Sequence, residues 1–446
     1  MENLVNLVIV VLPFQAWRVD AVALTDTPGV QWAIITDAGS VPLLDTDRFA
    51  WVEVANAFDA ESLAGIVRRR CASGRGVRLV AIHEGAVRAT APARERLGLA
   101  GPGEASVHHF LDKPAMKQRL AISAADLLPR WRVYDTEAAA RAPKAYITDL
   151  LHDPGLPIFA KPIDSVGSEG TALLANEHDI ERFLAAAGKR PYELDEYLHG
   201  PVYNADAVLF GGKVEWFGVC ELLNPPSEVL QRGRALASWT LPADAPEFAA
   251  LRKMVDRVIA AMEPPDGAIH LEGIRTARGF RFLEVACRPA GWLIPEAYLA
   301  AEGIDLRVGH LHAAAGIAPS IVPTLRRTGG YYAAIKTRPG NIVGHRTPML
   351  DVPHRCTHRP GRAGPAPSPG IFTHYFVCEV VAWHEEAKRL REALRGLNGF
   401  EPYVLADAAV EIDPRTQCGG AASVESSGLS DNQAGVIHRR RGATAA

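Results

Sequence analysis

The sequence lacks both glycine-rich motifs that most often mark a nucleotide site. No G-x-G-x-x-G follows the first apolar run, and no G-x-x-x-x-G-K-[ST] loop occurs anywhere in the 446 residues. The first absence removes the usual sign of a dinucleotide-binding unit. The second means that any site for a nucleoside triphosphate must be built from other residues.

Long apolar runs and charge of one sign are also missing. The longest apolar run near the start, Leu7–Leu12, is far too short to span a bilayer. Glu2 stands where a signal peptide would carry positive charge. A formal net charge of −3 provides no broad basic field, and the single basic run, His438–Arg441, lies in the C-terminal tail. We expect a cytoplasmic protein that binds neither nucleic acid nor membranes.

The cysteines are few and scattered. None of the six belongs to a C-x-x-C pair, which predicts reduced thiols and not a disulfide framework. The segment His354–His358 contains two histidines and Cys356, residue types that bind transition metals. The flanking prolines, Pro353 and Pro360, predict a loop there and argue against a metal site on a helix.

The order of apolar patterns predicts an α/β protein. Strand-like runs alternate with helix-like ones up to Gly101, as in a parallel sheet, and Gly98–Gly103 and Ala318–Gly330 read as boundaries. The expected strands and helices include strands 7–12, 32–36, 77–83 and 372–381, and helices 60–71 and 385–397, with Asp112 capping a further helix. The expected units are an N-terminal α/β domain (1–104), a central core (105–320), a C-terminal α/β subdomain with a mixed sheet (321–412) and a disordered tail (413–446).

A lysine followed by a flexible loop forms the first candidate site. Lys161 ends the apolar run that starts at Ile158, and a Gly/Ser-rich segment, 164–170, follows it. A buried lysine needs an anionic partner, and such a loop can place backbone N–H groups against phosphate oxygens. An edge-strand lysine before an ordinary turn explains the same residues. A second candidate, the acidic strand end at Tyr192–Gly200, could offer backbone groups to a base edge, although acidic strand ends are common.

Two glutamates on a predicted hairpin form the sharpest candidate. If residues 277–279 form a three-residue loop, Glu272 lies opposite Glu284, on one face with His270, Ala286 and Arg288. Facing carboxylates repel each other, and a divalent cation with oxygen ligands, best magnesium, would relieve that repulsion. A register shifted by one residue, or neutralisation by Arg288 alone, are the alternatives.

In this order, the three segments resemble the ATP-grasp superfamily over residues 105–320, in particular its carboxylate–amine ligase branch with the L-amino acid ligases. The resemblance implies ATP and Mg²⁺ as cofactors, with Mn²⁺ as a substitute. It implies phosphate contacts from Lys113 and Lys161, a phosphate-covering loop with Gly167, Ser168 and Gly170, and adenine contacts from Asp195, Glu196 and Leu198. It further implies metal binding by Glu272 and Glu284, and stabilisation of an acyl phosphate by Arg288.

The sequence departs from the family pattern at three places. Ala286 stands where an asparagine often supports the second metal, and Trp239 stands where some amino acid ligases have histidine. Val202 stands near the usual ribose-binding carboxylate, which leaves Glu193 or Asp206 as substitutes.

The expected activity is amide or peptide bond formation through an acyl phosphate, with release of ADP and phosphate, on amino acids or precursors of natural products such as antibiotics. The expected partners are a small carboxylate and an amine, and a homodimer is compatible with this reading. The alternatives are a carrier-protein thiol as nucleophile, an ATP-dependent carboxylase, or a non-catalytic ATP-binding regulator. No Ser/His/Asp or Cys/His arrangement suggests a nucleophilic side chain.

Overall fold

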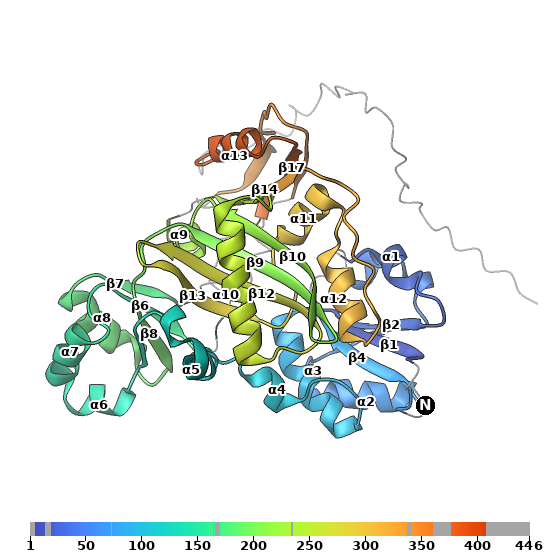
Figure 1. Cartoon of the computed structure of the whole chain (residues 1–446), viewed down its shortest axis with the longest axis horizontal. Helices are drawn as coiled ribbons and strands as arrows, with labels where there is room; N and C mark the ends of the chain where they lie inside the picture. Colours follow the sequence, from blue (N-terminus) through green and yellow to red (C-terminus); the bar gives the residue numbers. More distant parts are fainter. Residues whose placement is uncertain are drawn as a thin grey trace, which may run out of the picture. The chain divides into compact units, whose positions relative to one another are not determined.

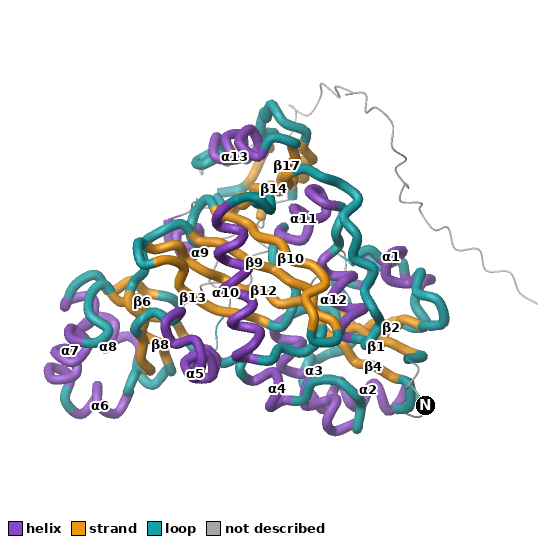
Figure 2. Tube along the Cα trace, in the orientation of Figure 1, coloured by secondary structure: helices purple, strands orange, loops and turns teal. Residues whose placement is uncertain are grey.

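In a computed structural model, the strands among the described residues form three sheets of four or more strands (Figures 1 and 2). The structure describes residues 5–13, 19–72, 74–163, 165, 170–232, 235–336, 340–359 and 376–406. Gly167, Ser168 and the tail predicted to be disordered, 413–446, lie outside these residues. One further pair of short strands, β15 (Ile342–His345) and β18 (Tyr403–Leu405), completes the described sheets.

The first sheet confirms the parallel α/β prediction for the N-terminal region. Its strand order is β3-β2-β1-β4, all parallel, and its strands are β1 (Leu7–Val11), β2 (Gln31–Thr36), β3 (Val52–Val54) and β4 (Val77–Ala81). The β1 strand is apolar throughout because both of its faces are buried. The helices of this region are α1 (Ala21–Thr25), α2 (Ala60–Arg70) and α3 (Glu84–Leu97). Residues 98–103, the predicted boundary, lie between the end of α3 and the start of α4 (Glu104–His108).

A small antiparallel sheet follows a capped helix. In α5 (Lys113–Ala124), the Asp112 carboxylate accepts the N–H of Ala115, as the sequence predicts. The small sheet has the order β5-β8-β6-β7, from β5 (Trp131–Val133), β6 (Ile158–Pro162), β7 (Ala172–Leu174) and β8 (Tyr192–Glu196). Its helices are α6 (Thr136–Arg141), α7 (Pro143–His152) and α8 (Glu177–Ala187).

The large sheet has eight strands in antiparallel pairs, in the order β13-β12-β9-β10-β11-β14-β17-β16. The strands are β9 (Val202–Phe210), β10 (Lys213–Leu222), β11 (Leu236–Thr240), β12 (Gly267–Thr276), β13 (Gly279–Ala286), β14 (Thr328–Ile335), β16 (His354–His358) and β17 (Phe376–His384). The sequence predicts a C-terminal subdomain over 321–412. Of the described strands of that region, β14, β16 and β17 belong to the large sheet, whereas β15 and β18 pair with each other. A local pattern cannot tell which sheet a strand joins.

Helices cover both faces of the large sheet. Side chains that alternate along the strands sort into two apolar clusters. One contains Trp239 and Tyr332 and packs against α10 (Pro246–Met262) and α13 (Ala387–Gly396), and the other contains Trp216 and Tyr331 and packs against α11 (Ile294–Glu302) and α12 (Leu306–Ala314). Figure 1 shows α10 lying across β9, β10 and β12. The short helix α9 (Pro226–Arg232) follows β10.

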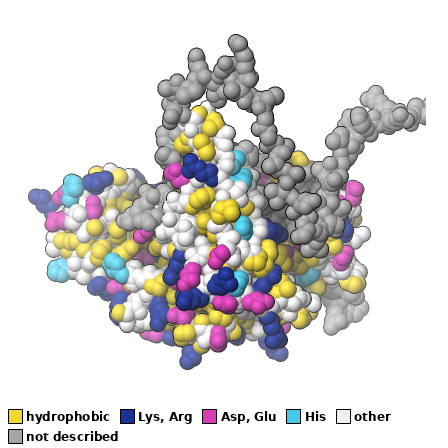
Figure 3. Space-filling model, turned by 90° about the horizontal axis from the view of Figure 1, so that it is seen from above, with side chains coloured by type: hydrophobic (Ala, Val, Ile, Leu, Met, Phe, Trp, Pro, Cys, Tyr) yellow, Lys and Arg dark blue, Asp and Glu magenta, His cyan; other side chains and the backbone are white. Residues whose placement is uncertain are grey.

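Two further findings concern the surface. The segment 354–358 is a strand, so the predicted loop is wrong. It is the edge strand of its sheet, where flanking prolines are tolerated because one side needs no hydrogen-bonded partner. No helix among the described residues is long and apolar enough to cross a bilayer. Basic and acidic side chains are interspersed on the coloured part of the face in Figure 3.

Candidate active site

The two glutamates of the predicted hairpin lie directly opposite each other. Glu272 of β12 pairs with Glu284 of β13, which confirms the expected pair. The predicted three-residue loop is wrong, because Thr276 pairs with Gly279 and leaves two residues in the turn. A β-bulge restores the register: Gly273 pairs with Phe282, so one extra residue, Leu283, is accommodated in β13.

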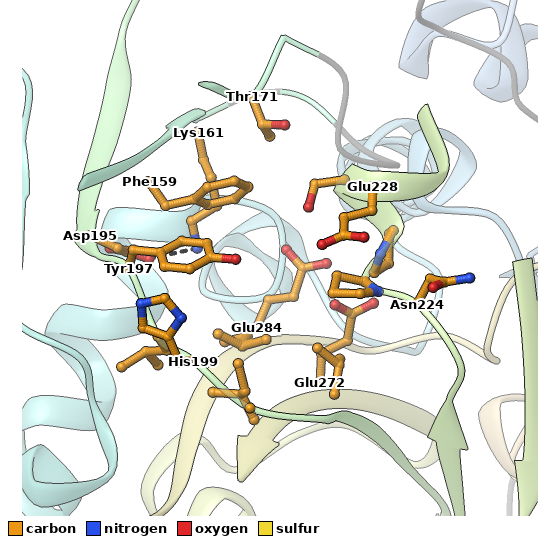
Figure 4. Close-up of a pocket in the computed structure, with 18 of the residues that line it drawn as sticks. Phe159, Lys161, Thr171, Asp195, Tyr197, His199, Asn224, Glu228, Glu272 and Glu284 are labelled. Carbon is orange, nitrogen blue, oxygen red and sulfur yellow. Dashed lines mark ion pairs between the residues drawn. The ribbon is translucent and has the colours of Figure 1, made fainter. Parts of the chain in front are cut away.

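Both glutamates face a cavity between the small sheet and the large sheet. Figure 4 shows their carboxylates pointing into it, with Lys161 and Tyr197 on one side and Glu228 on another. The charged and polar residues that line the cavity are Lys113, Lys161, Ser165, Thr171, Asp195, Glu196, His199, Asn224, Ser227, Glu228, Glu272 and Glu284. Its apolar lining includes Phe159, Leu198, Val202, Ile274 and Leu283. One cavity therefore combines an apolar portion with a strongly charged one.

The pKa values of the two hairpin carboxylates are shifted in opposite directions. Burial raises the pKa of Glu284, and the negative charge of Glu272 raises it further. Burial also acts to raise the pKa of Glu272, but hydrogen bonding and attraction from His270, followed by Arg288 and Lys161, hold it below the usual value. A divalent cation between the two carboxylates would relieve this repulsion. Oxygen ligands beside a cavity fit magnesium.

A buried network orients Glu272. Nε2 of His270 lies 3.6 Å from Glu272 Oε1, and its Nδ1 lies 2.8 Å from Asp206 Oδ1. The Tyr298 hydroxyl donates to the other oxygen of Asp206 at 2.9 Å. Burial alone would lower the pKa of His270, but Asp206 and Glu272 raise it to about 9. The imidazolium therefore holds Glu272 from one side. Asp206 was a candidate for ribose binding, and this buried network makes that prediction wrong.

Two lysines and two acids form a second buried network beside the glutamates. Nζ of Lys161 lies 2.7 Å from Asp195 Oδ2 and 3.4 Å from Glu193 Oε1. Lys117 Nζ contacts the same two acids, at 2.5 Å from Asp195 and 2.8 Å from Glu193. Burial disfavours the Lys161 ammonium, but the two acids outweigh it and raise the pKa, so the charge persists. The alternative of an ordinary edge-strand lysine is wrong, because Lys161 is 9% exposed on an interior strand.

Lys117 is the residue that sequence reasoning missed. It is 1% exposed, and its Nζ lies 5.5 Å from the centre of the Trp131 ring. A signal for it existed, since Lys117 lies four residues after Lys113 and so on the same side of α5. Glu193 was also a candidate for ribose binding, but it is fully buried among these lysines and does not line the cavity, so that prediction is wrong as well.

Lys113, the second lysine predicted to contact phosphates, also lines this cavity. Lys113 Nζ donates to the backbone oxygen of Ser165 at 2.7 Å, and both residues line the cavity. Gly170 adopts a left-handed φ of +69°, which favours glycine, and the next residue, Thr171, lines the cavity. Lys113 thus joins helix α5 to the start of the predicted phosphate-covering loop.

The predicted adenine contacts divide into two groups. Leu198 lines the cavity together with Phe159 and Tyr197. The Glu196 carboxylate instead bonds Arg278 at 2.7 Å and Arg130 at 3.2 Å, which leaves its backbone as the part suited to a ligand. The Asp195 carboxylate is bound by the two buried lysines.

Arg288 comes from the end of β13 and does not line the cavity. Its Nη2 donates to Oε2 of Glu84, the first residue of α3, at 2.9 Å. Burial acts to lower the pKa of Arg288, but Glu84, Glu284 and Glu272 outweigh this and raise it. The guanidinium therefore stays charged and lies within electrostatic range of both hairpin glutamates.

No family model and no curated protein matches the sequence. Several solved structures match the fold. An L-amino acid ligase from Bacillus licheniformis aligns with a TM-score of 0.69 and 15% identity, over 90% of this chain and 99% of that one. Carboxyaminoimidazole ribonucleotide synthase from Aspergillus clavatus complexed with ATP gives 0.65 and 14%, over 89% and 98%. The biotin carboxylase domain of Hydrogenobacter thermophilus 2-oxoglutarate carboxylase, with MgADP, gives 0.60 and 17%, over 89% and 90%.

These likenesses show that this chain has the ATP-grasp fold.

Proposed function

We propose that this protein is an ATP- and magnesium-dependent ligase that joins a carboxylate to an amine, with an amino acid as one substrate. The observation that carries the proposal is the cavity in which Glu272 and Glu284 oppose each other beside Lys161 and Lys113. Paired acids suit a cation, and adjacent lysines suit phosphate oxygens. The solved structures of the same fold include a ligase that acts on amino acids and enzymes complexed with ATP or MgADP.

The residues that line the cavity suit the base and the phosphates of the nucleotide. Phe159, Leu198 and Leu283 provide apolar surface for the base, and the backbone of Glu196 and Leu198 provides its polar contacts. Lys161 and Lys113 would contact the phosphates. Asp195 acts through Lys161, because its carboxylate fixes the position of the ammonium.

When bound, ATP would supply the γ-phosphoryl group that makes an acyl phosphate of the carboxylate, with ADP as the leaving group, and magnesium would neutralise charge on the phosphate oxygens. Attack by the amine would then release phosphate and one proton. The protein's own residues hold and neutralise charge. Glu272 and Glu284 would hold the metal, with His270 orienting Glu272. Arg288, held by Glu84, would stabilise charge that develops on the acyl group. Of the residues predicted to cover the phosphates, Gly167 and Ser168 lie outside the described part of the chain, and Gly170 is described.

The test is ADP release from Mg-ATP over pairs of amino acids and small acids, combined with trapping of the activated acid by hydroxylamine. Glu272→Gln and Glu284→Gln should each lower the rate on the order of 10²-fold, as loss of one charge-stabilising group does. Glu215→Gln is the matched control, because Glu215 is an exposed glutamate on β10 of the same sheet. A hydroxamate that forms equally in the wild type and both variants would contradict the assignment, as would no ATP-dependent hydroxamate with any acid.

The carboxylase alternative keeps the same cavity, and the solved structures of this fold include a biotin carboxylase domain with bicarbonate. ADP release measured as amines, thiols and bicarbonate are added singly separates these reactions. Stimulation by amines alone supports the proposal, whereas stimulation by bicarbonate alone would replace it with carboxylation.

A further inference from the structure

A cluster of soft metal ligands lies on the edge strand β16 of the large sheet and on its neighbour β17, outside the residues that line the active-site cavity. It consists of Cys356 and His358 on β16 and Cys378 on β17, and its donor atoms all lie within 4.8 Å of one another. Cys378 is buried, and the other two side chains are partly exposed. None of the three takes part in the proposed ligase chemistry.

The β-ladder explains how the three residues come together. His358 is directly opposite Cys378, and Cys356 is opposite Val380, in antiparallel register. Residues two apart on a strand share a face, so Cys356 and His358 both point to the side of Cys378. The strand that the sequence pattern missed is therefore what creates the cluster, because a loop would not impose this alternation.

The two distances from Cys356 Sγ to the other donor atoms match those between ligands on one tetrahedral ion. The Sγ atoms of Cys356 and Cys378 are 3.6 Å apart, and Nε2 of His358 is 3.6 Å from Cys356 Sγ. Zinc–sulfur bonds of about 2.3 Å and zinc–nitrogen bonds of about 2.0 Å place two sulfurs about 3.8 Å apart, and sulfur and nitrogen about 3.5 Å apart. Thiolate and imidazole ligands also select zinc over magnesium or calcium, which prefer oxygen.

A disulfide fits the same cysteines less well. Cys356 and Cys378 are diagonal neighbours across the two strands, since Cys356 pairs with Val380. Diagonal Cα atoms in an antiparallel pair are about 7–8 Å apart, whereas a disulfide usually needs less than about 7 Å. A metal ion bridges the longer gap without moving the backbone.

The imidazole of His358 turns Nε2 toward the cluster, 3.6 Å from Cys356 Sγ, and this nitrogen also lies 3.2 Å from the hydroxyl oxygen of Thr347, a contact that a bound metal ion would replace. Nδ1 of His358 is buried and has no hydrogen-bond partner among the described residues, an arrangement that is rare for a structural histidine. The His345 ring packs 4.8 Å away, centre to centre.

We propose that Cys356, His358 and Cys378 bind one zinc ion, with water as the fourth ligand, and that this ion fastens the edge strand β16 to β17. Binding converts two thiols into thiolates and releases two protons to the solvent. No electrons are transferred. The site holds a strand that has a single neighbour in its sheet.

The test uses the full chain, stripped with a chelator and kept reduced. Zn²⁺ is added in the presence of excess Mg²⁺, which occupies oxygen-rich sites but does not compete for thiolates. We expect one zinc per chain by metal analysis. We expect Co²⁺ to give the near-ultraviolet absorption of cobalt–thiolate bonds.

Two variants decide whether the cluster is the site. Cys356→Ser and His358→Ala change partly exposed side chains, and each should weaken zinc binding at least about 100-fold, because loss of a direct ligand costs no less than loss of its supporting partner. Cys71→Ser, which changes a half-buried thiol elsewhere, should bind zinc like the wild type. Chelation should lower the unfolding temperature of the wild type but not that of Cys356→Ser.

Absence of stoichiometric zinc binding would overturn the proposal, and so would wild-type affinity in both variants. A Cys356–Cys378 disulfide that forms reversibly while zinc does not bind would assign the pair to redox chemistry instead. All of these outcomes are independent of whether the ligase reaction is found.

Discussion

At the scale of single residues, burial of charge is the main feature of the site. Glu193 and Asp195 are two residues apart on β8 and share a face, and Lys161 pairs with Glu193 across the ladder. Lys117 approaches the same acids from α5. Four charges thus neutralise one another away from water. Such a network is stable only while it is complete.

Removing one charge from this network should therefore lower the stability of the folded protein. Lys117→Met leaves two buried carboxylates with a single ammonium, and we expect the free energy of unfolding to fall by about 3–5 kcal/mol. Denaturant unfolding measures this directly. Lys213→Met, which changes an exposed lysine on β10, should alter stability by less than about 0.5 kcal/mol. Equal losses in the two variants would show that the buried charges are not what matters.

At the scale of elements, a buried histidine joins the N-terminal sheet to the large sheet. His310 of α12 accepts the backbone N–H of Ala268 on β12 through Nδ1, at 2.8 Å. Its Nε2 therefore carries the proton and donates to the carbonyl oxygen of Ala81 on β4, at 2.9 Å. Burial lowers the pKa of His310 to about 4, because the site disfavours the charged ring.

This lowered pKa predicts a loss of stability in mild acid. The unfolded chain takes up a proton as the pH falls below about 6.5, while the folded chain does so only near the lowered value, so the stabilisation is complete above the unfolded pKa and is lost between the two. From pH 7 to pH 5, His310 should account for a decrease of about 2 kcal/mol in the free energy of unfolding.

His310→Gln should remove this part of the pH dependence, although it lowers stability at pH 7. Denaturant unfolding at both pH values measures the difference. His152→Gln, which changes an exposed histidine of α7, should keep the wild-type dependence. An unchanged slope in His310→Gln would mean that other groups cause the acid sensitivity.

At the scale of the whole molecule, the N-terminal sheet contributes to the site through one ion pair. Glu84 begins α3, and its carboxylate holds Arg288 at the end of β13. Both side chains are 18% exposed, so the pair is only partly screened by water. The N-terminal region thereby fixes a residue that we place in the ligase chemistry.

Glu84→Gln should accordingly lower the turnover number about 10- to 100-fold, as loss of a supporting partner does, while the KM for ATP changes little. Steady-state ADP release measures both. Glu61→Gln is a matched control, since Glu61 also lies in a first turn, that of α2, but pairs only with exposed arginines. A raised KM with unchanged turnover would show that Glu84 acts on nucleotide binding instead.

The sequence alone was sufficient to predict what depends on local alternation and on local charge. The parallel N-terminal strands, the capped α5 helix and the facing Glu272 and Glu284 follow from patterns within a few residues of each other. Even there, the structure differs from the prediction in two ways that cancel: the turn is one residue shorter, and a bulge adds one residue to β13, so Glu272 still pairs with Glu284.

Tertiary structure alone decided which distant side chains meet. Lys117 reaches acids 76 and 78 residues away, Glu84 reaches an arginine 204 residues away, and the cysteines of β16 and β17 share a face only because the two strands pair. Spacing along a chain carries no information about such contacts. These contacts are determined by the burial of charge and by the register of the sheet, and both exist only in the folded state.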